Sequence, residues 1–297
     1  MRFGALEAGG TKMVCAIGDE TGKILDRVSI PTETPERTMP KLLEYFRDRE
    51  IDALGIGCFG PVDLNPSSET WGYITTTSKL SWINYDICGC FRENLKVPIG
   101  FDTDVNGSML GEATWGCAKG LDTAIYITVG TGVGVGVLAG GRLLHGMQHP
   151  EGGHMLLARR ADDAYEGKCP YHGTCLEGLA AGPAIEARWG EKAERLADRP
   201  EVWELEAYYL AYAITNYIMI LSPQRIILGG GVMHQEQLMP QVRAKVKEML
   251  GGYIQTKELS DMDSCIICPS LNDNQGILGA LKLGIDAKTA ADKQKNL

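Results

Sequence analysis

Three polar residues occupy alternate positions in the stretch GFDTDVNG, residues 100–107. Asp102, Asp104 and Asn106 follow the apolar residues 97–99, which predicts that they lie at the end of a strand. Alternate side chains of an extended segment lie on one face, so the three could point the same way. A carboxylate at such a strand end could accept a proton from an alcohol as a general base. The alternative is a helix N-cap followed by ordinary turn acids.

A second candidate for chemistry is the stretch EGKCPYHGTCLEG, residues 166–178. Cys169, His172 and Cys175 are separated by two-residue gaps, so a tight turn could bring all three to one metal ion. Structural zinc takes four such ligands, and His154, fifteen residues before Cys169, is the candidate for the fourth. Four protein ligands leave no open position, so the predicted site is structural rather than catalytic. The alternative is a loop with reduced thiols and no metal.

The remaining clustered cysteines and single histidines are not predicted to bind a metal. Cysteines with CxxC spacing at 265–268 lie in an apolar stretch that is predicted as a strand, where their side chains would point to opposite faces. We interpret these residues as packing, surface or helix-capping groups: Cys88, Cys90, Cys265, Cys268, His145, His149 and His234.

One unit that would position the candidate residues occurs twice in the chain. In residues 3–30 an apolar strand runs into the turn Gly-Gly-Thr at 9–11, and two further strands follow. In residues 124–144 the same order recurs around Gly-Thr-Gly at 130–132. Turns of small residues present backbone N–H groups that can hold phosphate. The repeat predicts two similar α/β domains, with unrelated hairpins as the alternative for either unit alone.

Hydrophobic periodicity predicts further helices and strands between and after the repeated units. Helices are predicted over 40–49 and 202–221, and strands over 51–59 and 225–228. The last of these strands runs into three glycines, where a nucleotide could lie against bare backbone. The tyrosine stripe of the second helix, at 208, 209 and 212, is interpreted as core, and the polar residues from 286 onward as an irregular tail.

Composition and charge restrict the class of protein. The 297 residues suffice for two domains of ordinary size. A net charge of −9 argues against binding to nucleic acid or a membrane surface, and no apolar run approaches the ~20 residues of a membrane span. The first residues lack the apolar region of a signal peptide, so we expect a cytoplasmic protein. Thiols stay reduced there, which favours metal binding over disulfides.

The order and spacing of the glycine motifs resemble those of the ROK family (repressor, open reading frame, kinase), and most closely its fructokinase branch. The resemblance covers residues 1 to about 285 and rests on the motifs LEAGGTK, TDVN, VGTGVG, EGGH and LGGGV. It implies the actin-like ATPase fold: two similar α/β, ribonuclease H-like domains around a cleft, with a zinc-stabilised loop. We expect domains at 1–116 and 117–297, and a terminal helix near 275–285 could pack back on the first domain.

The resemblance assigns roles to individual residues. Asp104 matches the catalytic aspartate of the family. The residues implied in sugar binding are Gly60, Thr103, Asn106, Glu151, His154 and Glu177. Those implied in binding ATP are Glu7, Gly9, Gly10, Thr11, Lys12, Gly130, Thr131, Gly132, Leu228, Gly229, Gly230, Gly231 and Val232. The family places its fourth zinc ligand at His154, and more often has three cysteines where this chain has Cys169, His172 and Cys175.

The chain departs from the family pattern at two positions. Glu7 stands where the first phosphate motif usually has Asp, so the carboxylate extends one methylene further, with Mg²⁺ reached directly or through water. Thr103 stands where the catalytic segment usually has Asn, so a single hydroxyl replaces an amide with two donors and an acceptor. The change at Thr103 weakens the inference that this chain shares the aldose specificity of glucokinase-like relatives. It is compatible with the fructokinase branch.

The predicted reaction is phosphoryl transfer from Mg-ATP to fructose, giving fructose 6-phosphate and ADP, with Asp104 as general base and zinc as a structural ion. Alternatives within the family are kinases for mannose, glucose or an N-acetylated hexosamine. A sugar-responsive regulator without catalysis is a further alternative; a repressor would carry a DNA-binding element ahead of the first motif, where only six residues precede Glu7. The family implies a homodimer, and no nucleic-acid or membrane partner is expected.

Overall fold

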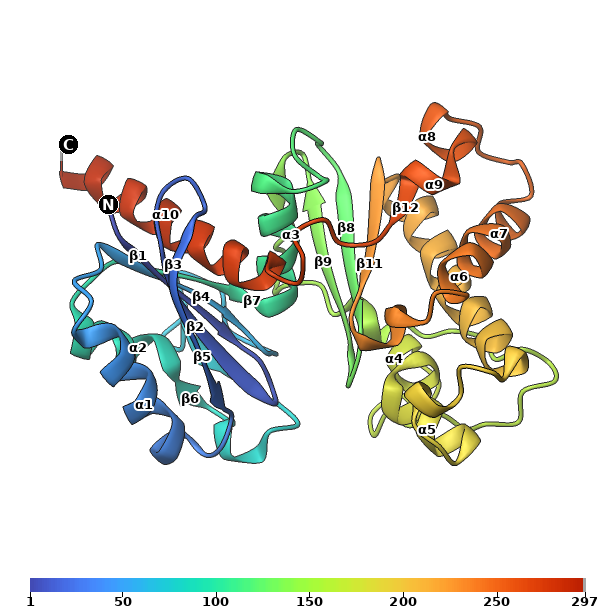
Figure 1. The fold of residues 1–297 in the computed structure, drawn as a ribbon, viewed down its shortest axis with the longest axis horizontal. Helices are drawn as coiled ribbons and strands as arrows, with labels where there is room; N and C mark the ends of the chain where they lie inside the picture. Colours follow the sequence, from blue (N-terminus) through green and yellow to red (C-terminus); the bar gives the residue numbers. More distant parts are fainter. Residues whose placement is uncertain (296–297) are drawn as a thin grey trace. The chain divides into compact units, whose positions relative to one another are not determined.

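The computed structural model describes residues 1–295 and divides into two compact units, each built on its own β-sheet (Figure 1). The first unit consists of Met1–Gly120, Leu143–His149 and the chain from Ser270 onward. The second unit consists of Leu121–Arg142 and Pro150–Pro269. Segments that are far apart in the sequence therefore share one unit.

The first unit is built on a five-stranded sheet with the order β3-β2-β1-β4-β7. Its strands are β1 (Phe3–Ala8), β2 (Lys12–Gly18), β3 (Ile24–Pro31), β4 (Ala53–Cys58) and β7 (Ile99–Thr103). β1 pairs antiparallel with β2 and parallel with β4, and β4 pairs parallel with β7. Ala8, Cys58 and Thr103 are in register, so the carboxyl ends of three parallel strands meet at one edge of the sheet.

Helices cover both faces of this sheet. They are α1 (Pro35–Arg47), α2 (Ile87–Leu95), α3 (Asp104–Trp115) and α10 (Gln275–Lys295), with the 3₁₀ turn η1 (Leu80–Trp82) and the hairpin β5 (Tyr73–Ile74) and β6 (Tyr85–Asp86). Because side chains alternate along a strand, Leu6 and Met13 pack in the cluster that contains α1 and α2, whereas Ala5 and Val14 pack against α10. The sheet is thus buried between two hydrophobic layers.

Helix α10 is longer than the sequence predicts. The polar residues from Asp286 onward, predicted as an irregular tail, continue the helix to Lys295. Lysine–aspartate pairs four residues apart, Lys282 with Asp286 and Lys288 with Asp292, support the helix on its polar side. The polar composition therefore marks an exposed helix face rather than irregular chain, and residues 296 and 297 lie outside the described residues.

The second unit repeats the sheet pattern of the first. Its strand order is β10-β9-β8-β11-β12, from β8 (Ala124–Val129), β9 (Val133–Ala139), β10 (Arg142–Leu143), β11 (Arg225–Gly229) and β12 (Ile266–Ile267). β8 pairs antiparallel with β9 and parallel with β11, as β1 does with β2 and β4. The repeated strand–turn–strand unit read from the sequence is therefore the start of each sheet.

The second unit contains one long helix, α6 (Pro200–Leu221), which packs against two shorter helices, α4 (Leu176–Ala180) and α7 (Leu238–Leu250). Its other helices are α5 (Gly182–Trp189), α8 (Lys257–Ser260) and α9 (Met262–Cys265), with 3₁₀ turns η2 (Gly152–His154), η3 (Ala193–Arg195) and η4 (Gly231–His234). The C-terminal strand predicted at 265–268 is only β12, because Cys265 still belongs to α9.

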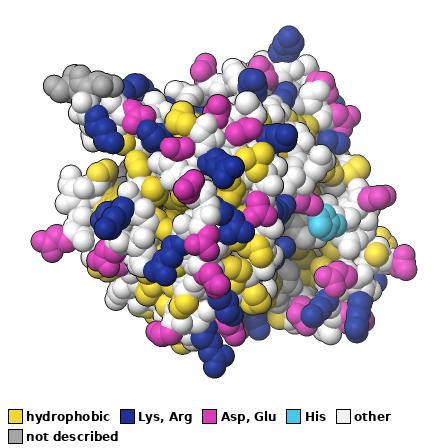
Figure 2. Space-filling model, turned by 60° about the vertical axis from the view of Figure 1, so that its left-hand side comes forward, with side chains coloured by type: hydrophobic (Ala, Val, Ile, Leu, Met, Phe, Trp, Pro, Cys, Tyr) yellow, Lys and Arg dark blue, Asp and Glu magenta, His cyan; other side chains and the backbone are white. Residues whose placement is uncertain are grey.

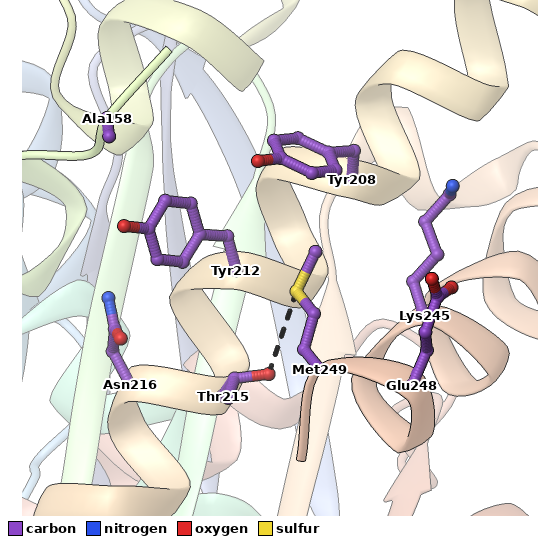
Figure 3. Close-up of a pocket in the computed structure, with 8 residues that line it drawn as sticks. All are labelled: Ala158, Tyr208, Tyr212, Thr215, Asn216, Lys245, Glu248 and Met249. Carbon is purple, nitrogen blue, oxygen red and sulfur yellow. Dashed lines mark hydrogen bonds between the residues drawn. The ribbon is translucent and has the colours of Figure 1, made fainter. Parts of the chain in front are cut away.

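The tyrosine stripe of α6 is only partly core. Tyr209 is buried, whereas Tyr208 and Tyr212 line a cavity of about 470 Å³ between α6 and α7. Figure 3 shows these two rings on α6, with Lys245 and Met249 opposite them on α7. None of the predicted site residues lines this cavity.

The surface carries charges of both signs. Figure 2 shows acidic and basic side chains interspersed with apolar ones over the face that it displays. Among residues 1–295, each helix is too short or too polar to cross a lipid bilayer.

Candidate active site and metal centre

The corner between β7 and α3 holds the predicted catalytic residue. Thr103 is the N-cap of α3, and its hydroxyl oxygen accepts a hydrogen bond from the backbone N–H of Asn106 at 3.1 Å. Asp104 is therefore the first residue of a helix. The predicted extended conformation ends at Thr103, and the helix N-cap given as the alternative is present from there on. Asp102 and Asn106 still meet across one helical turn, with Asn106 Nδ2 donating to Asp102 Oδ1 at 2.7 Å.

Asp104 is partly buried, and its pKa is raised. One carboxylate oxygen accepts a hydrogen bond from the backbone N–H of Val105 at 2.8 Å, which favours the ionised form. Burial outweighs this bond and raises the pKa of Asp104 from 3.8 to about 6. A carboxylate with a pKa just below neutrality is mostly ionised at neutral pH and yet basic enough to accept a proton. These properties suit a general base.

Glu7, near the end of β1, is a second carboxyl group with a raised pKa. Burial, and then the negative charge of Asp104, raise the pKa of Glu7 from 4.5 to about 7. The first turn of α10 leaves room for this carboxylate, because a β-carbon at Gly276 would lie only 2.5 Å from Glu7 Oε1. A divalent cation binds carboxylate oxygens and would relieve the repulsion between the two carboxylates. Glu7 therefore fits a place beside Mg²⁺ despite its extra methylene.

Residues 9–11 form the turn between β1 and β2. The backbone N–H of Gly9 donates to the carbonyl oxygen of Lys12 at 3.1 Å, and Thr11 and Lys12 are exposed. Lys79 approaches the same turn, since its Cε lies 3.1 Å from the position of a β-carbon on Gly10. An ammonium group beside a glycine turn suits an anion. Sequence reasoning missed Lys79, because no local pattern connects it with a turn so far away in the chain.

Two histidines of the first unit have partners that the sequence did not predict. His145 Nε2 lies 2.8 Å from Asp102 Oδ2. His149 is buried and accepts a hydrogen bond from the backbone N–H of Val62 at 3.2 Å. Its ring also lies against Gly60, where a β-carbon would be 3.4 Å from His149 Cε1. The prediction of surface or capping residues is wrong for His149 and incomplete for His145, because both contacts form only in the tertiary structure.

In the second unit, the turn between β8 and β9 is tied to a predicted sugar-binding residue. Within the turn, the backbone N–H of Gly130 donates to the carbonyl oxygen of Gly132 at 2.9 Å. Glu177 Oε2 accepts a hydrogen bond from the backbone N–H of Val133 at 3.0 Å. Thr131 and Glu177 line a small cavity of about 50 Å³. One carboxylate therefore connects the predicted phosphate turn to α4, the helix that begins directly after the predicted zinc ligand Cys175.

The glycines at 228–232 lie beside the same turn. Gly230 has a φ of +92°, which favours glycine, and a β-carbon there would lie 2.4 Å from the carbonyl oxygen of Val129. A β-carbon on Gly130 would lie 3.9 Å from the backbone nitrogen of Gly231. The two glycine segments that the sequence assigns to ATP are thus neighbours within the second unit.

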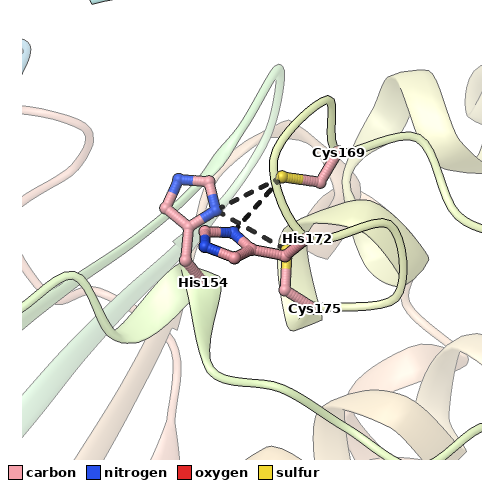
Figure 4. Close-up of side chains that lie close together, drawn as sticks. All are labelled: His154, Cys169, His172 and Cys175. Atoms are coloured by element: carbon pink, nitrogen blue, oxygen red, sulfur yellow. Dashed lines mark hydrogen bonds between the residues drawn. The ribbon is translucent and has the colours of Figure 1, made fainter. Parts of the chain in front are cut away.

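The four predicted zinc ligands lie together in the second unit (Figure 4). Their ligand atoms are all within 4.8 Å of one another. Cys169 Sγ is 3.7 Å from His154 Nδ1 and 3.6 Å from His172 Nδ1, and Cys175 Sγ is 3.6 Å from His154 Nδ1. Tetrahedral zinc, with Zn–S of about 2.3 Å and Zn–N of about 2.0 Å, sets such ligands about 3.5 Å apart. The side chains present therefore fit a zinc ion.

The thiols of this cluster are buried and the loop is ordered around them. Cys175 is the N-cap of α4, where its sulfur accepts a hydrogen bond from the backbone N–H of Gly178. Burial raises the pKa of the Cys175 thiol to about 11, so a cation is needed to hold it as a thiolate at neutral pH. By contrast Cys268, outside the cluster, is exposed.

The predicted sugar-binding glutamates flank the cluster. Because His154 Nδ1 faces the sulfur atoms, its Nε2 faces Glu177, with 4.0 Å between Nε2 and Glu177 Oε1. The carbonyl oxygen of Glu151 accepts a hydrogen bond from the backbone N–H of His154 at 3.0 Å. A carboxylate on the far side of a ligating imidazole fixes its orientation. The predicted zinc ligand His154 thus lies next to the backbone of Glu151 and the carboxylate of Glu177.

A sequence model of the ROK family matches residues 3–287. This chain belongs to the ROK family. A protein of Bacillus subtilis is 51% identical over 97% of this chain and 97% of its own. A fructokinase of Pediococcus pentosaceus is 44% identical over 95% of this chain and 97% of its own. The crystal structure of a ROK hexokinase from Thermus thermophilus matches with a TM-score of 0.79 and 27% identity, over 98% of this chain and 100% of that chain.

The predicted fold of this ROK protein is confirmed. Two α/β units with the same sheet order form the actin-like ATPase fold that the solved ROK structures share. Each unit brings together its own set of predicted residues. The first unit holds Glu7, Gly9, Gly10, Thr11, Lys12, Gly60, Thr103, Asp104 and Asn106. The second holds the predicted zinc ligands, Glu151, Glu177 and the glycines at 130–132 and 229–231.

Proposed function

We propose that the protein is an ATP-dependent fructokinase that transfers the γ-phosphoryl group of ATP to the 6-hydroxyl of fructose. The observation that carries the proposal is Asp104, a partly buried carboxylate with a pKa of about 6 at the first position of α3. The names of relatives such as the Pediococcus pentosaceus and Streptococcus mutans fructokinases, 44% and 41% identical, support fructose as the sugar.

Asp104 acts as the general base in this proposal. It accepts the proton of the sugar hydroxyl as the hydroxyl oxygen attacks phosphorus, and the bond between the γ-phosphorus and the bridging oxygen of ADP breaks. Phosphoryl transfer of this kind depends on positioning and charge neutralisation rather than on a covalent enzyme intermediate. The helix N-terminus at Asp104 stabilises its ionised form and so counteracts part of the burial.

The phosphates of ATP bind the glycine turns at 9–11 and 130–132 through backbone N–H groups in this proposal. The glycines at 229–231 take the adenosine. Lys79 adds a positive charge beside the first turn. Glu7 holds Mg²⁺ directly or through water, and the bound ion supplies charge neutralisation for the phosphate oxygens.

In this proposal, sugar hydroxyls bind the residues that the family resemblance implies, which are Gly60, Thr103, Asn106, Glu151, His154 and Glu177. His154, Cys169, His172 and Cys175 would hold zinc, and the bound ion would fix the segments that carry Glu151 and Glu177. Four protein ligands fill a tetrahedral site, so the ion itself takes no part in the reaction.

Release of ADP by the purified protein, with Mg-ATP and fructose, mannose, glucose or N-acetylmannosamine, tests the proposal. Turnover on fructose well above the other sugars is the expected result. Turnover only on another hexose would support the proposed kinase activity but contradict fructose as the substrate. Absence of turnover on every sugar, with sugar binding retained, would point to a sugar-responsive regulator.

We also propose a homodimer in the cytoplasm. Dimerisation is implied by the ROK family, and sedimentation of the purified chain as a monomer at micromolar concentration would contradict it. A cytoplasmic location is consistent with the free thiols of the chain, which persist in a reducing compartment.

A further inference from the structure

A buried carboxylate two residues before Asp104 has no part in the proposed transfer. Asp102 is 3% exposed, and each of its oxygens has a hydrogen-bond partner. Oδ1 accepts from the backbone N–H of Thr103 at 2.8 Å and from Asn106 Nδ2 at 2.7 Å, and Oδ2 lies 2.8 Å from His145 Nε2. A buried carboxylate with three partners is held in one orientation.

Asp102 fixes the orientation of the Asn106 amide. An ionised carboxylate only accepts hydrogen bonds, so the NH₂ group of Asn106 faces Asp102 and its carbonyl oxygen points away. This Oδ1 atom is buried and has no hydrogen-bond partner within residues 1–295. An unpaired buried acceptor is costly, and at a candidate site it points to a ligand that donates.

The chemistry of this acceptor identifies the part of the substrate that it contacts. The phosphate oxygens of ATP carry no proton to donate and would be repelled by a carbonyl oxygen beside the Asp102 carboxylate. A sugar hydroxyl donates readily. The Asn106 oxygen therefore suits a hydroxyl of the hexose and excludes phosphate.

His145 is the remaining partner of Asp102. It comes from the segment Leu143–His149, and its side chain is 40% exposed whereas that of Asp102 is only 4% exposed. Either protonated imidazole or the neutral tautomer with hydrogen on Nε2 can donate to Asp102. Without this donor, Asp102 Oδ2 would lose its hydrogen bond, and the carboxylate that holds Asn106 could turn.

We propose that His145 is a positioning residue for sugar binding, which acts through Asp102 on the Asn106 amide so that the amide oxygen accepts a hydrogen bond from a hydroxyl of the hexose. This inference rests on the proposed kinase function. His145 touches neither sugar nor ATP in this arrangement, so its effect should appear in the affinity for sugar rather than in the affinity for ATP.

The test compares His145→Ala with His145→Gln in steady-state kinetics. The Ala variant should raise KM for the hexose roughly tenfold, because a charge-assisted hydrogen bond is lost. KM for ATP should stay within about twofold of the wild type. Gln places an amide N–H near the position of Nε2, so the Gln variant should recover most of the loss. Equal losses in both variants, or an unchanged KM for the hexose, would overturn the proposal.

A matched control and a double-mutant cycle separate positioning from general destabilisation. Arg49→Ala removes a more exposed ion pair of the first unit, that of Arg49 with Asp26, and should leave both KM values unchanged. The double variant His145→Ala, Asn106→Ala should bind hexose no more weakly than Asn106→Ala alone, because His145 acts through that amide. Additive losses would contradict the proposal.

The same variants keep this inference separate from the proposed function. If the wild type uses a hexose other than fructose, the same tenfold shift in KM is expected for that hexose. If no sugar is phosphorylated, the fructokinase proposal fails, and calorimetric binding of hexose to the wild type and to His145→Ala decides the role of His145. Equal affinities of the two proteins for the hexose, or no binding to either, would overturn the proposed role of His145.

Discussion

The two units use the same sheet order for different purposes. In each, an antiparallel hairpin is followed by parallel strands, with a glycine turn after the first strand. What differs is the set of side chains around those turns. The first unit has the carboxyl groups of Glu7, Asp102 and Asp104, and the second has thiols, imidazoles and Glu177. The common backbone supplies the turns, and the added side chains determine the chemistry.

The carboxyl groups of the two units are held differently. Burial raises the pKa values of Asp104 to about 6 and of Glu7 to about 7, which suits exchange of a proton near neutrality. In the second unit, Glu177 accepts a hydrogen bond from the backbone beside the glycine turn and faces a predicted zinc ligand. Under the proposed function, the first unit would carry out proton transfer and the second would position the substrate.

Asp104→Asn should cause the largest loss of activity. An amide cannot accept the proton of the sugar hydroxyl, so kcat should fall by roughly 10²–10⁴-fold while hexose binding is partly retained. Measuring kcat by ADP release and hexose affinity by calorimetry gives both quantities. If the variant kept more than a tenth of the wild-type kcat, Asp104 would not be the general base.

Glu177→Gln is the matched change in the second unit. It also replaces a carboxylate with an amide, and the amide oxygen can still accept from the backbone N–H of Val133. Glu177→Gln should therefore raise KM for the hexose by a larger factor than it lowers kcat. If Glu177→Gln cost as much in kcat as Asp104→Asn, the division of labour between the units would be wrong.

Removal of zinc should have the next largest effect and should act on the second unit. Metal analysis is expected to give one zinc per chain, lost in Cys175→Ser, because a buried thiol is replaced by a weaker ligand. The temperature at which unfolding begins, measured by calorimetry, should be at least several degrees lower after chelation. Cys268→Ser changes an exposed cysteine of the same unit and should keep the metal. A metal content well below one equivalent, unaffected by chelation, would contradict the site.

Local spacing in the sequence predicted those parts of the protein that form within short segments. The repeated strand–turn–strand unit predicted the start of both sheets, and the gaps between Cys169, His172 and Cys175 allow one short loop to hold all three. The helix cap at Thr103 was not distinguished from a strand end, because the same residue types serve both.

Contacts between distant segments could not be predicted in this way. His145 meets Asp102 across 43 positions of the chain, and Gly276 meets Glu7 only because α10 returns to the first sheet. Such contacts depend on packing, and a single histidine or glycine has no periodic pattern to reveal them. The side chains around the predicted base are therefore the part of the site that required the structure.

In the absence of Mg²⁺, Glu7→Gln should change stability and should give the smallest of these expected changes. The pKa of Glu7 is raised from 4.5 to about 7, so the folded protein binds the proton more tightly than the unfolded chain. The free energy of unfolding should therefore fall as pH rises from about 4.5 to about 7, by at most about 3 kcal/mol. Glu7→Gln removes the contribution of Glu7 to this pH dependence and should be more stable than the wild type at pH 8, measured by urea unfolding without divalent cations.

The control for this prediction is Glu44→Gln, which removes an exposed carboxylate of the same unit. It should leave the free energy of unfolding at pH 8 close to that of the wild type. Part of the raised pKa of Glu7 comes from the charge of Asp104, so Glu7→Gln should stabilise less in an Asp104→Asn background. A gain of the same size in both backgrounds would mean that burial alone raises the pKa of Glu7, and that the two carboxylates of the first unit act independently.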